Sequence, residues 1–275
     1  MYKKVLTIQD ISCIGQCSLT VALPIISACG HETAVLPSAV LSTHTAGFSG
    51  YTFRDLTDDM PDVCNHWIKE KIKFSAIYTG YLGSTKQIDY VKDIIESTKE
   101  KDAKIIVDPA MADNGKLYPG FDQNFVNAMK KLVGISDYVV PNVTEACMLT
   151  GVEYKTEYTK EYVDELVQKL LSLGAKNVIL TGIGYIDGKT GVVVVEDGKY
   201  SYYEHDKESN SCHGTGDIYA SAFVGALTCG KSAYESAKIA ADYTVLCIKE
   251  TAKLDNHWYG AAFEPVLGEL IKMVK

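Results

Sequence analysis

Short hydrophobic runs alternate with amphipathic segments along most of the chain. The runs have the length and the β-branched content of buried strands, and they occupy residues 3–8, 31–37, 74–80, 103–109, 136–142 and 176–182. Between them, apolar positions recur at spacings of three and four, which predicts helices at 16–29, 86–101, 122–133, 144–150 and 160–173. Strands that alternate with helices predict an α/β fold in which helices cover both faces of a parallel sheet.

The last third of the chain departs from this alternation. The segment GVVVVEDGKYSYYE (191–204) holds two β-rich runs on either side of an Asp-Gly dipeptide, which is typical of a tight hairpin turn. Two helices are expected between 216 and 250, and a final helix near 261–273. Because we find no linker, repeat or low-complexity segment, we expect one domain over residues 1–275, with an antiparallel hairpin appended to the parallel sheet.

Residues 225–232 read GALTCGKS, which has the spacing of a nucleotide-binding phosphate loop. In that motif a strand leads into the loop, whereas the apolar residues of 217–227 have helical spacing. Gly230 suits the end of a helix, and Ser232 with Glu235 forms the pattern of a capped helix start. We therefore predict a helix–turn–helix corner here and no phosphate site.

Composition and charge exclude several classes of function. The net charge is −8 and no basic run is present, which argues against a surface for nucleic acid or for an anionic membrane. The N-terminal residues MYKKVLTIQD include no long apolar region, and no apolar run reaches the length of a membrane span. The eight cysteines form no C-x-x-C pair, so we expect them to be reduced in a cytoplasmic protein.

The segment SCHGTGDIYASAF (211–223) has the chemistry of a phosphate site. Gly214 and Gly216 flank Thr215 just before a predicted helix, where glycines let backbone N–H groups approach a ligand closely. The helix N-terminus adds roughly half a positive charge. Asp217 lies in the first turn and is placed to accept the proton of a substrate hydroxyl that attacks a γ-phosphate. The alternative is an Asp that only stabilises the start of the helix.

A second set of polar residues follows other predicted strands. Asp108 ends one strand, and Asn142 and Glu145 lie three residues apart at a strand-to-helix turn. Ligands of such sheets bind at the carboxyl ends of the strands, and carboxylates near nucleotide phosphates suit Mg²⁺. A helix-capping arrangement explains the Asn-x-x-Glu spacing equally well. The stretch TGIGYIDG (181–188) lacks the G-x-G-x-x-G spacing, which disfavours an NAD-dependent oxidoreductase.

These motifs resemble those of the ribokinase superfamily. More narrowly, VLTIQD, LSTHT, YTGY, VDPAM, PNVTEACMLTG and GTGDIYASAF are similar in order and spacing to pyridoxal kinases over nearly the whole chain. The resemblance implies a ribokinase-like three-layer sandwich without a separate lid domain. It implies transfer of the γ-phosphate of ATP to the 5′-hydroxymethyl group of a vitamin B6 vitamer (pyridoxal, pyridoxine or pyridoxamine). It further implies Mg²⁺, often K⁺, and a homodimer.

The resemblance also assigns roles on the nucleotide side of the site. Asp217 corresponds to the base, and residues 214–216 correspond to the anion hole. Asp108 and Glu145 correspond to the residues that organise Mg²⁺ and the phosphates, with Asn142 nearby.

The remaining assignments concern the triphosphate and the pyridine ring. Thr181 corresponds to a contact of the triphosphate, and Thr45 and Tyr81 correspond to residues that line the ring pocket. The main departure from the pattern is Asp10, which stands where those kinases usually carry a serine, and Ala112 stands where a glycine is common. We expect a carboxylate there to change ring recognition. The sequence leaves two alternatives for His44, pocket shaping or a structural role, and two for His213, contact with phosphate or with solvent; Cys212 is interpreted as structural.

Two other functions compete with this interpretation. Hydroxymethylpyrimidine (phosphate) kinases share the fold and a similar heteroaromatic hydroxymethyl substrate, but they commonly show a glycine-rich run after the first strand and a cysteine in place of Asp217. A non-catalytic vitamin B6 or nucleotide binder is the other alternative. The joint presence of Asp217, Glu145 and Asp108 argues against it.

Overall fold

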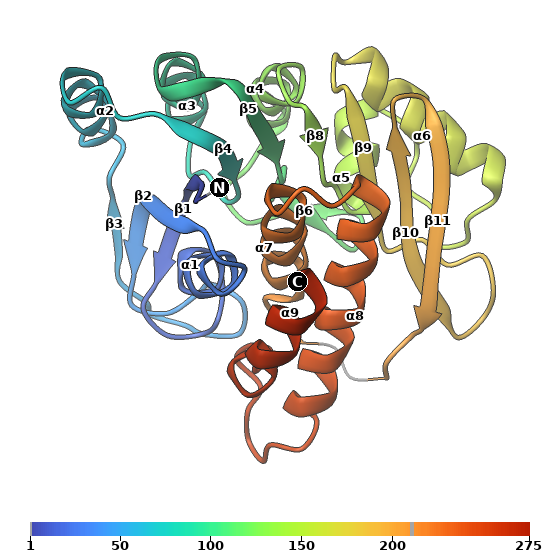
Figure 1. The fold of residues 1–275 in the computed structure, drawn as a ribbon. Coiled ribbons are helices and arrows are strands. Elements are labelled where there is room, and N and C mark those ends of the chain that lie inside the picture. The colour runs from blue at the N-terminus through green and yellow to red at the C-terminus, as the bar shows by residue number, and fades with distance from the viewer. Residues whose placement is uncertain (1, 210–211) are drawn as a thin grey trace.

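The computed structural model describes residues 2–209 and 212–275. Within these residues, nine strands form a central sheet in the order β11-β10-β9-β8-β5-β4-β1-β2-β3 (Figure 1). Six of them pair in parallel: β1 (Lys4–Ser12), β2 (Glu32–Leu41), β4 (Phe74–Thr79), β5 (Lys99–Val107), β8 (Tyr138–Val139) and β9 (Asn177–Thr181). Three join antiparallel: β3 (Phe53–Asp55), β10 (Lys189–Glu196) and β11 (Lys199–Asp206).

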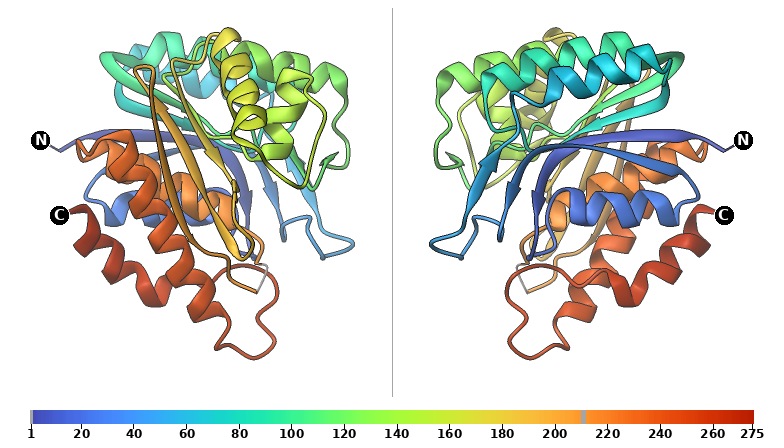
Figure 2. Two further views of the ribbon diagram at one scale, coloured as in Figure 1. Left: turned by 90° about the vertical axis from the view of Figure 1, so that its right-hand side faces the viewer. Right: turned by 90° about the vertical axis from the view of Figure 1, so that its left-hand side faces the viewer.

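Helices cover both faces of this sheet (Figure 2). One layer contains α2 (Met60–Lys69), α3 (Thr85–Thr98), α4 (Gln123–Val133), α5 (Val143–Thr150) and α6 (Lys160–Ser172). The other contains α1 (Leu19–Ala28), α7 (Thr215–Thr228), α8 (Ala233–Thr251) and α9 (Leu267–Val274), with the 3₁₀ turn η1 (Glu264–Val266) before α9. Each layer has its own hydrophobic core against the sheet, so the expected α/β sandwich is confirmed.

The appended hairpin forms as the sequence predicts. Strands β10 and β11 pair antiparallel from Lys189 opposite Asp206 to Glu196 opposite Lys199. Asp197 and Gly198 between them both have positive φ angles, 50° and 76°, which is the conformation of a two-residue hairpin turn.

Several predicted boundaries are wrong. The helix expected at 86–101 ends at Thr98, and Lys99 already pairs with Phe74 as the start of β5. The helix expected from residue 16 begins at Leu19, because the chain before it adopts positive φ angles at residues 15, 16 and 18. The last helix begins at Leu267, after η1. The sequence analysis assigned no element to β3, to α2 or to the small hairpin of β6 (Ala112–Asp113) and β7 (Lys116–Leu117).

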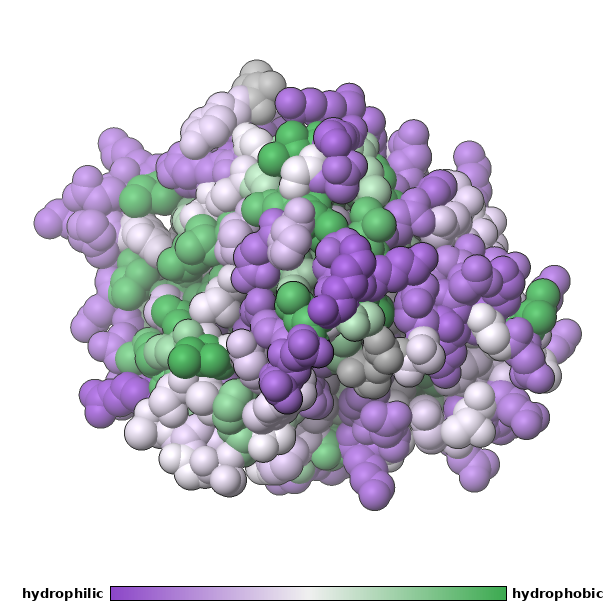
Figure 3. Space-filling model, turned by 90° about the horizontal axis from the view of Figure 1, so that it is seen from below, coloured by the Kyte–Doolittle hydropathy of each residue, from purple (hydrophilic) through white to green (hydrophobic). Residues whose placement is uncertain are grey.

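The carboxyl ends of the parallel strands open on the lower side of the molecule in Figure 1. Figure 3 shows this face, on which apolar side chains are more frequent on the left half than on the right. Among the described helices, none combines the length and the apolar content that a bilayer crossing requires.

The GALTCGKS segment forms a corner between two helices. Helix α7 ends at Thr228, and Gly230 has a φ angle of 96°. Ser232 caps α8, with its hydroxyl accepting from the Glu235 N–H while the Glu235 carboxylate accepts from the Ser232 N–H. The predicted corner is confirmed. Because α7 has 14 residues, the corner lies roughly 21 Å from the start of that helix.

We expect Lys231→Ala to leave kcat and the affinity for ATP within about twofold of wild type. A phosphate-loop lysine contacts the β- and γ-phosphates, so its loss would be severe, whereas Lys231 lies at the end of α7 opposite the Gly214 turn. Steady-state kinetics and a thermal melt test this. A hundredfold loss of kcat/KM in a folded variant would show that the corner is a phosphate site.

Candidate active site

Asp217 lies where the N-termini of two helices meet. Helix α7 begins after Gly214, whose φ angle of 77° favours glycine, and a Cβ atom there would collide with the Gln16 carbonyl oxygen. Helix α1 begins after Ser18, and the Ser18 N–H donates a hydrogen bond to the Asp217 carboxylate. The partly buried Asp217 side chain is therefore held between both helix starts.

The environment of Asp217 tunes its acidity. The pKa of this carboxyl is raised to about 7, because burial raises it by more than the hydrogen bond from Ser18 lowers it, and the nearby Asp10 adds a smaller rise. A pKa near the working pH suits a group that accepts a proton during a reaction. The charge state of Asp217 is thus poised to change around neutral pH.

Asp108 and Glu145 form an acidic cluster with Asp217. Asp108 follows β5 and is buried; its pKa lies well above the usual range because of burial, Glu145 and Asp217, in that order. The pKa of Glu145 is also raised to about 7. Burial raises it, and this effect outweighs the hydrogen bonds from the N–H groups of residues 142, 111 and 112, which lower it. Carboxylates whose charges raise the pKa of Asp108 in this way favour a cation among them.

Glu145 has a structural role as well. Its Oε2 accepts from the Asn142 N–H at 2.9 Å, and the Asn142 side chain accepts from the Glu145 N–H at 2.9 Å, which is a capping box at the start of α5. Glu145 Oε1 accepts from the Met111 N–H at 3.2 Å, and Asn142 Nδ2 donates to the Ala112 carbonyl at 2.9 Å. The helix cap that the sequence analysis gave as an alternative is therefore present. The Glu145 side chain that forms it also lies near Asp108.

Thr181 lies beside this turn. Its N–H and its hydroxyl both donate to the Pro141 carbonyl oxygen, at 3.0 and 3.2 Å, and the residue pairs with Asn142 at the end of β9. The structure thus brings Thr181 next to the capping box that holds Glu145.

The acidic cluster fits a magnesium ion that arrives with a nucleotide. Among the described residues, no group of three or more histidine, cysteine or acidic side chains is arranged to hold a metal on its own. Mg²⁺ commonly takes one or two carboxylates and completes its shell with phosphate oxygens and water. Asp108 and Glu145 supply such a pair.

Asp10 belongs to a second group of residues next to Asp217, separate from Asp108 and Glu145. It lies within β1, which runs on to Ser12, and its carboxylate accepts from the Ser12 hydroxyl at 2.9 Å and from Ser18. Burial raises its pKa. Asp10 in turn contributes, after burial, to the pKa of about 12 at Tyr81. Asp10 and Tyr81, both predicted to face the ring, are therefore neighbours.

Tyr81 and Thr45 lie on different segments of this side. The Tyr81 ring packs on Phe121 with centroids 5.5 Å apart, and Phe121 stacks on Phe125 at 3.8 Å. Thr45 is exposed, in the loop after β2 and next to the buried His44. The charge of Asp10 acts on His44, so the Thr45 segment reaches the same region.

The residues before α1 were missed by the sequence analysis. Ser18 contacts both Asp10 and Asp217, and Cys17 lies close to the same two carboxylates, which raise the pKa of its thiol further after burial. The one sequence signal is a glycine followed by a serine just before a helix, in CIGQCSLT. Tyr118 was also missed. Its pKa is raised by burial and then by Glu145 and Asp108, which places it beside the acidic cluster.

Cys212 and His213 have no catalytic environment in the structure. Burial raises the pKa of the Cys212 thiol, which is the opposite of what a nucleophilic thiolate needs. The exposed His213 ring lies 5.5 Å from the His44 ring, and its carbonyl accepts from the Ala261 N–H.

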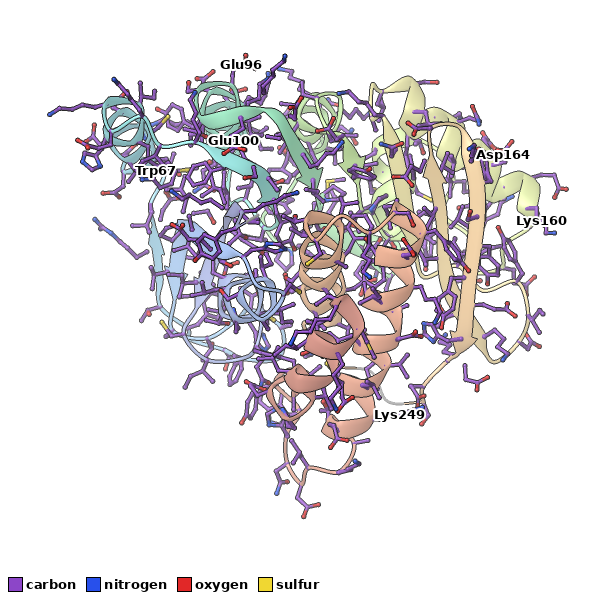
Figure 4. All side chains as sticks on the ribbon, viewed as in Figure 1. Trp67, Glu96, Glu100, Lys160, Asp164 and Lys249 are labelled. Carbon is purple, nitrogen blue, oxygen red and sulfur yellow. The ribbon has the colours of Figure 1, made fainter. Side chains whose placement is uncertain are left out.

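A separate hollow lies between α6 and the hairpin. Lys160, Asp164 and Tyr200 line it, and the first two are labelled in Figure 4. The Tyr200 hydroxyl donates to Asp164 at 2.6 Å. None of the predicted site residues lines this hollow, so it is distinct from the acidic cluster.

A sequence profile described as phosphomethylpyrimidine kinase matches residues 25–262, which is most of the chain. The chain belongs to this family. It is therefore a phosphotransferase that uses an alcohol group as acceptor.

Individual relatives carry two kinds of name. Pyridoxal kinase of Dictyostelium discoideum is 25% identical over 82% of this chain and 78% of its own length. Hydroxymethylpyrimidine/phosphomethylpyrimidine kinase of Aquifex aeolicus is 28% identical over 70% of this chain and 76% of its own.

Solved structures agree with the fold over nearly the whole chain. A Bacteroides thetaiotaomicron protein, provisionally named phosphomethylpyrimidine kinase and crystallised with pyridoxal, has a TM-score of 0.92 at 36% identity, over 98% of this chain and 96% of its own. Pyridoxal kinase of Lactobacillus plantarum has a TM-score of 0.91 at 28% identity, over 99% and 98%. The ribokinase-like fold implied by the sequence motifs is confirmed.

Proposed function

We propose that the protein transfers the γ-phosphate of ATP to the 5′-hydroxymethyl group of a vitamin B6 vitamer, with Asp217 as the base. The observation that carries the proposal is the position of Asp217 between two groups of residues. On one side its charge acts on Asp108, which also faces Glu145. On the other side it meets Asp10, which neighbours Tyr81.

The nucleotide side supplies the phosphate-binding groups. The N–H groups of residues 214–216 and the N-terminus of α7 face the γ-phosphate in this proposal, and Thr181 contacts the triphosphate. Asp108 and Glu145 would hold Mg²⁺, which would neutralise charge on the phosphates. Pyridoxal kinase of Staphylococcus aureus, which shares the fold, was solved with ADP. A requirement for K⁺ and a homodimeric state belong to the same proposal.

The proposed chemistry needs positioning more than strong basicity. The acceptor hydroxyl gives its proton to Asp217 while its oxygen bonds to the γ-phosphorus, and ADP leaves with the electrons of the broken bond. The ring of the acceptor lies toward Asp10, Thr45 and Tyr81, where the tyrosine covers a ring face.

A panel of acceptors tests the function. ADP release from MgATP is measured with pyridoxal, pyridoxine, pyridoxamine and hydroxymethylpyrimidine, and with no acceptor. We expect kcat/KM to be highest for a pyridine vitamer. ATP turnover that no acceptor stimulates would contradict the proposal, and the absence of any ADP release would favour a non-catalytic binder.

Phosphorylation of hydroxymethylpyrimidine is the second candidate function. The matching family profile and the Aquifex aeolicus relative both carry pyrimidine kinase names, and both substrates present a hydroxymethyl group on a heteroaromatic ring. The panel of acceptors distinguishes the two functions, because a pyrimidine kinase would show a higher kcat/KM for hydroxymethylpyrimidine than for any vitamin B6 vitamer.

We expect kcat/KM to rise with pH through a midpoint near 7 and then to level off. Asp217 must be unprotonated to accept the hydroxyl proton, and burial raises its pKa to about 7, so activity is lost as the pH falls below that value. The profile is measured with pyridoxal and with pyridoxamine, because a midpoint common to both belongs to the enzyme. A flat profile from pH 5.5 to 8.5 would contradict the assignment.

We further expect Asp10 to bias the choice of vitamer. A buried carboxylate needs donors, and the amine of pyridoxamine or a protonated ring nitrogen adds one to the Ser12 and Ser18 side chains, whereas the aldehyde of pyridoxal cannot. Pyridoxamine or pyridoxine should therefore be used better than pyridoxal, and Asp10→Ser should shift preference toward pyridoxal. The measurement is kcat/KM for three vitamers in both proteins; equal ratios would show that Asp10 does not recognise the ring.

A further inference from the structure

The loop that joins α8 to η1, residues 252–263, contacts the loop after β2, the residues before α1 and the residue before Gly214. We name this loop the C-terminal strap. It forms the lower end of the molecule in Figures 1 and 2, on the same side as the carboxyl ends of the parallel strands. None of its residues was assigned a role by the sequence motifs.

The strap binds the loop between β2 and β3, residues 42–52, which carries Thr45 and which we call the Thr45 loop. The His44 imidazole accepts from the Ala46 N–H through Nδ1 at 3.1 Å, so its proton lies on Nε2 and is donated to the Tyr259 carbonyl oxygen at 2.7 Å. The Trp258 ring packs against Phe48 with centroids 4.7 Å apart.

Glycines allow both contacts to be close. A Cβ atom at Gly47, whose φ angle is 87°, would lie 2.7 Å from the Trp258 ring. A Cβ atom at Gly15 would collide with the His44 imidazole. The two side chains therefore pack directly on backbone, which fixes the path of the loop.

The strap also binds the two segments that hold Asp217. The Ala261 N–H donates to the His213 carbonyl at 3.0 Å, one residue before Gly214. Gln16 lies two residues before Ser18, and its Oε1 atom is 3.0 Å from His257 Nε2 of the strap. Gln16 Nε2 also donates to Glu264, the first residue of η1, at 3.1 Å. The strap thus joins the anion hole, the start of α1 and the Thr45 loop.

The Thr45 loop is held by contacts at its base, by the His44 N–H, which donates to the Ile14 carbonyl at 3.2 Å, and by the strap. At its base the Ser42 N–H donates to the Thr52 carbonyl at 3.2 Å, and the Thr52 N–H donates to the Ser42 hydroxyl at 2.9 Å. Beyond the base, the strap supplies the Trp258 and Tyr259 contacts. A loop that is ordered before the ligand arrives binds more tightly than one that must be ordered on binding.

We propose that Trp258 is a positioning residue that sets the affinity for the ring acceptor by holding the Thr45 loop in place. This inference rests on the proposed function, because it concerns the acceptor of that reaction. Trp258 is 52% exposed, with one side against Gly47 and Phe48. It acts on the acceptor through the loop and touches none of the reacting atoms.

The first experiment separates acceptor affinity from the chemical step. In Trp258→Ala we expect KM for the best vitamer to rise at least about tenfold, with kcat within about threefold and KM for MgATP within about twofold of wild type. Trp258→Phe keeps an aromatic ring against Gly47 and should restore KM to within about threefold. A merely structural role would lower the active fraction and hence kcat, and would leave KM unchanged.

The second experiment reports binding without turnover. The chain has two tryptophans, and Trp67 lies on α2 at the upper left of Figure 4, packed on Phe74 with ring centroids 5.4 Å apart. Trp67→Phe leaves Trp258 as the sole tryptophan, and its emission should change with saturating acceptor in the absence of nucleotide. Trp258→Phe keeps only Trp67, so the change in its emission measures how much light the acceptor itself absorbs, and this loss is subtracted from the signal of Trp258.

Each outcome decides the inference. A raised KM in Trp258→Ala together with an emission change at Trp258 supports it. Unchanged KM, or emission that matches the Trp67 control, overturns the inference and leaves the proposed function intact. If wild-type protein phosphorylates no acceptor of the panel, the proposed function fails and the inference fails with it.

Discussion

Asp217→Asn is expected to lower kcat by about 10² to 10⁴-fold while leaving the binding of MgATP largely intact. The asparagine keeps the shape of the side chain but cannot accept the hydroxyl proton, and general-base catalysis commonly contributes a factor of that size. Steady-state kinetics with the best acceptor gives kcat, and calorimetric titration gives the affinity for MgATP.

Folding does not confound this variant. A carboxyl whose pKa is raised to about 7 on folding costs stability as the pH rises through that value, so a neutral asparagine should be at least as stable as wild type at pH 8. A variant that melts at or above the wild-type temperature and still retains more than about a third of wild-type kcat would contradict the base assignment.

Gly214→Ala is the second change with a large expected effect. The left-handed backbone costs a non-glycine residue about 1–2 kcal/mol, and the new Cβ atom would collide with the Gln16 carbonyl oxygen. The turn must therefore shift, and a displacement of about 1 Å at reacting groups can lower the rate about 10²-fold. We expect both a lower melting temperature and a loss of kcat of at least about tenfold.

Gly216→Ala is the matched control in the same motif. A Cβ atom at Gly216 meets no other atom within 4 Å, and its φ angle is not in the left-handed region, so we expect an unchanged melting temperature. If the N–H groups of this turn approach a phosphate closely, the added methyl group should still raise KM for MgATP. If Gly214→Ala instead has the melting temperature and kcat of wild type, the geometry of this turn matters for neither stability nor catalysis.

The sequence predicts the sheet and the acidic cluster at its edge, for physical reasons. Strands buried on both faces form continuous apolar runs, and the polar residues that follow them must meet at one edge of a parallel sheet. For this reason the sequence alone predicts that Asp108, Asn142 and Glu145 lie together, whereas Thr181 was assigned only through the resemblance. The helix start at Asp217 likewise follows from its glycines.

The acceptor side depends on contacts that local sequence does not encode. The Ser18 N–H reaches Asp217 only because α1 and α7 pack side by side, nearly 200 residues apart in the chain. The C-terminal strap has no periodicity, and its partners His44 and Gln16 lie more than 200 residues away. The double role of Glu145, as a cap and as a neighbour of Asp108, also becomes visible only in the folded chain.

The most direct test of the central claim is the identity of the product. Wild-type protein is incubated with MgATP and, in separate reactions, with each vitamer and with hydroxymethylpyrimidine, and the product is examined by mass spectrometry and by phosphorus NMR with proton coupling. We predict a phosphate ester whose phosphorus couples to the two protons of the 5′-methylene group, formed in equal amount to ADP. Release of ADP without such an ester, or an ester formed only on hydroxymethylpyrimidine, would contradict the claim.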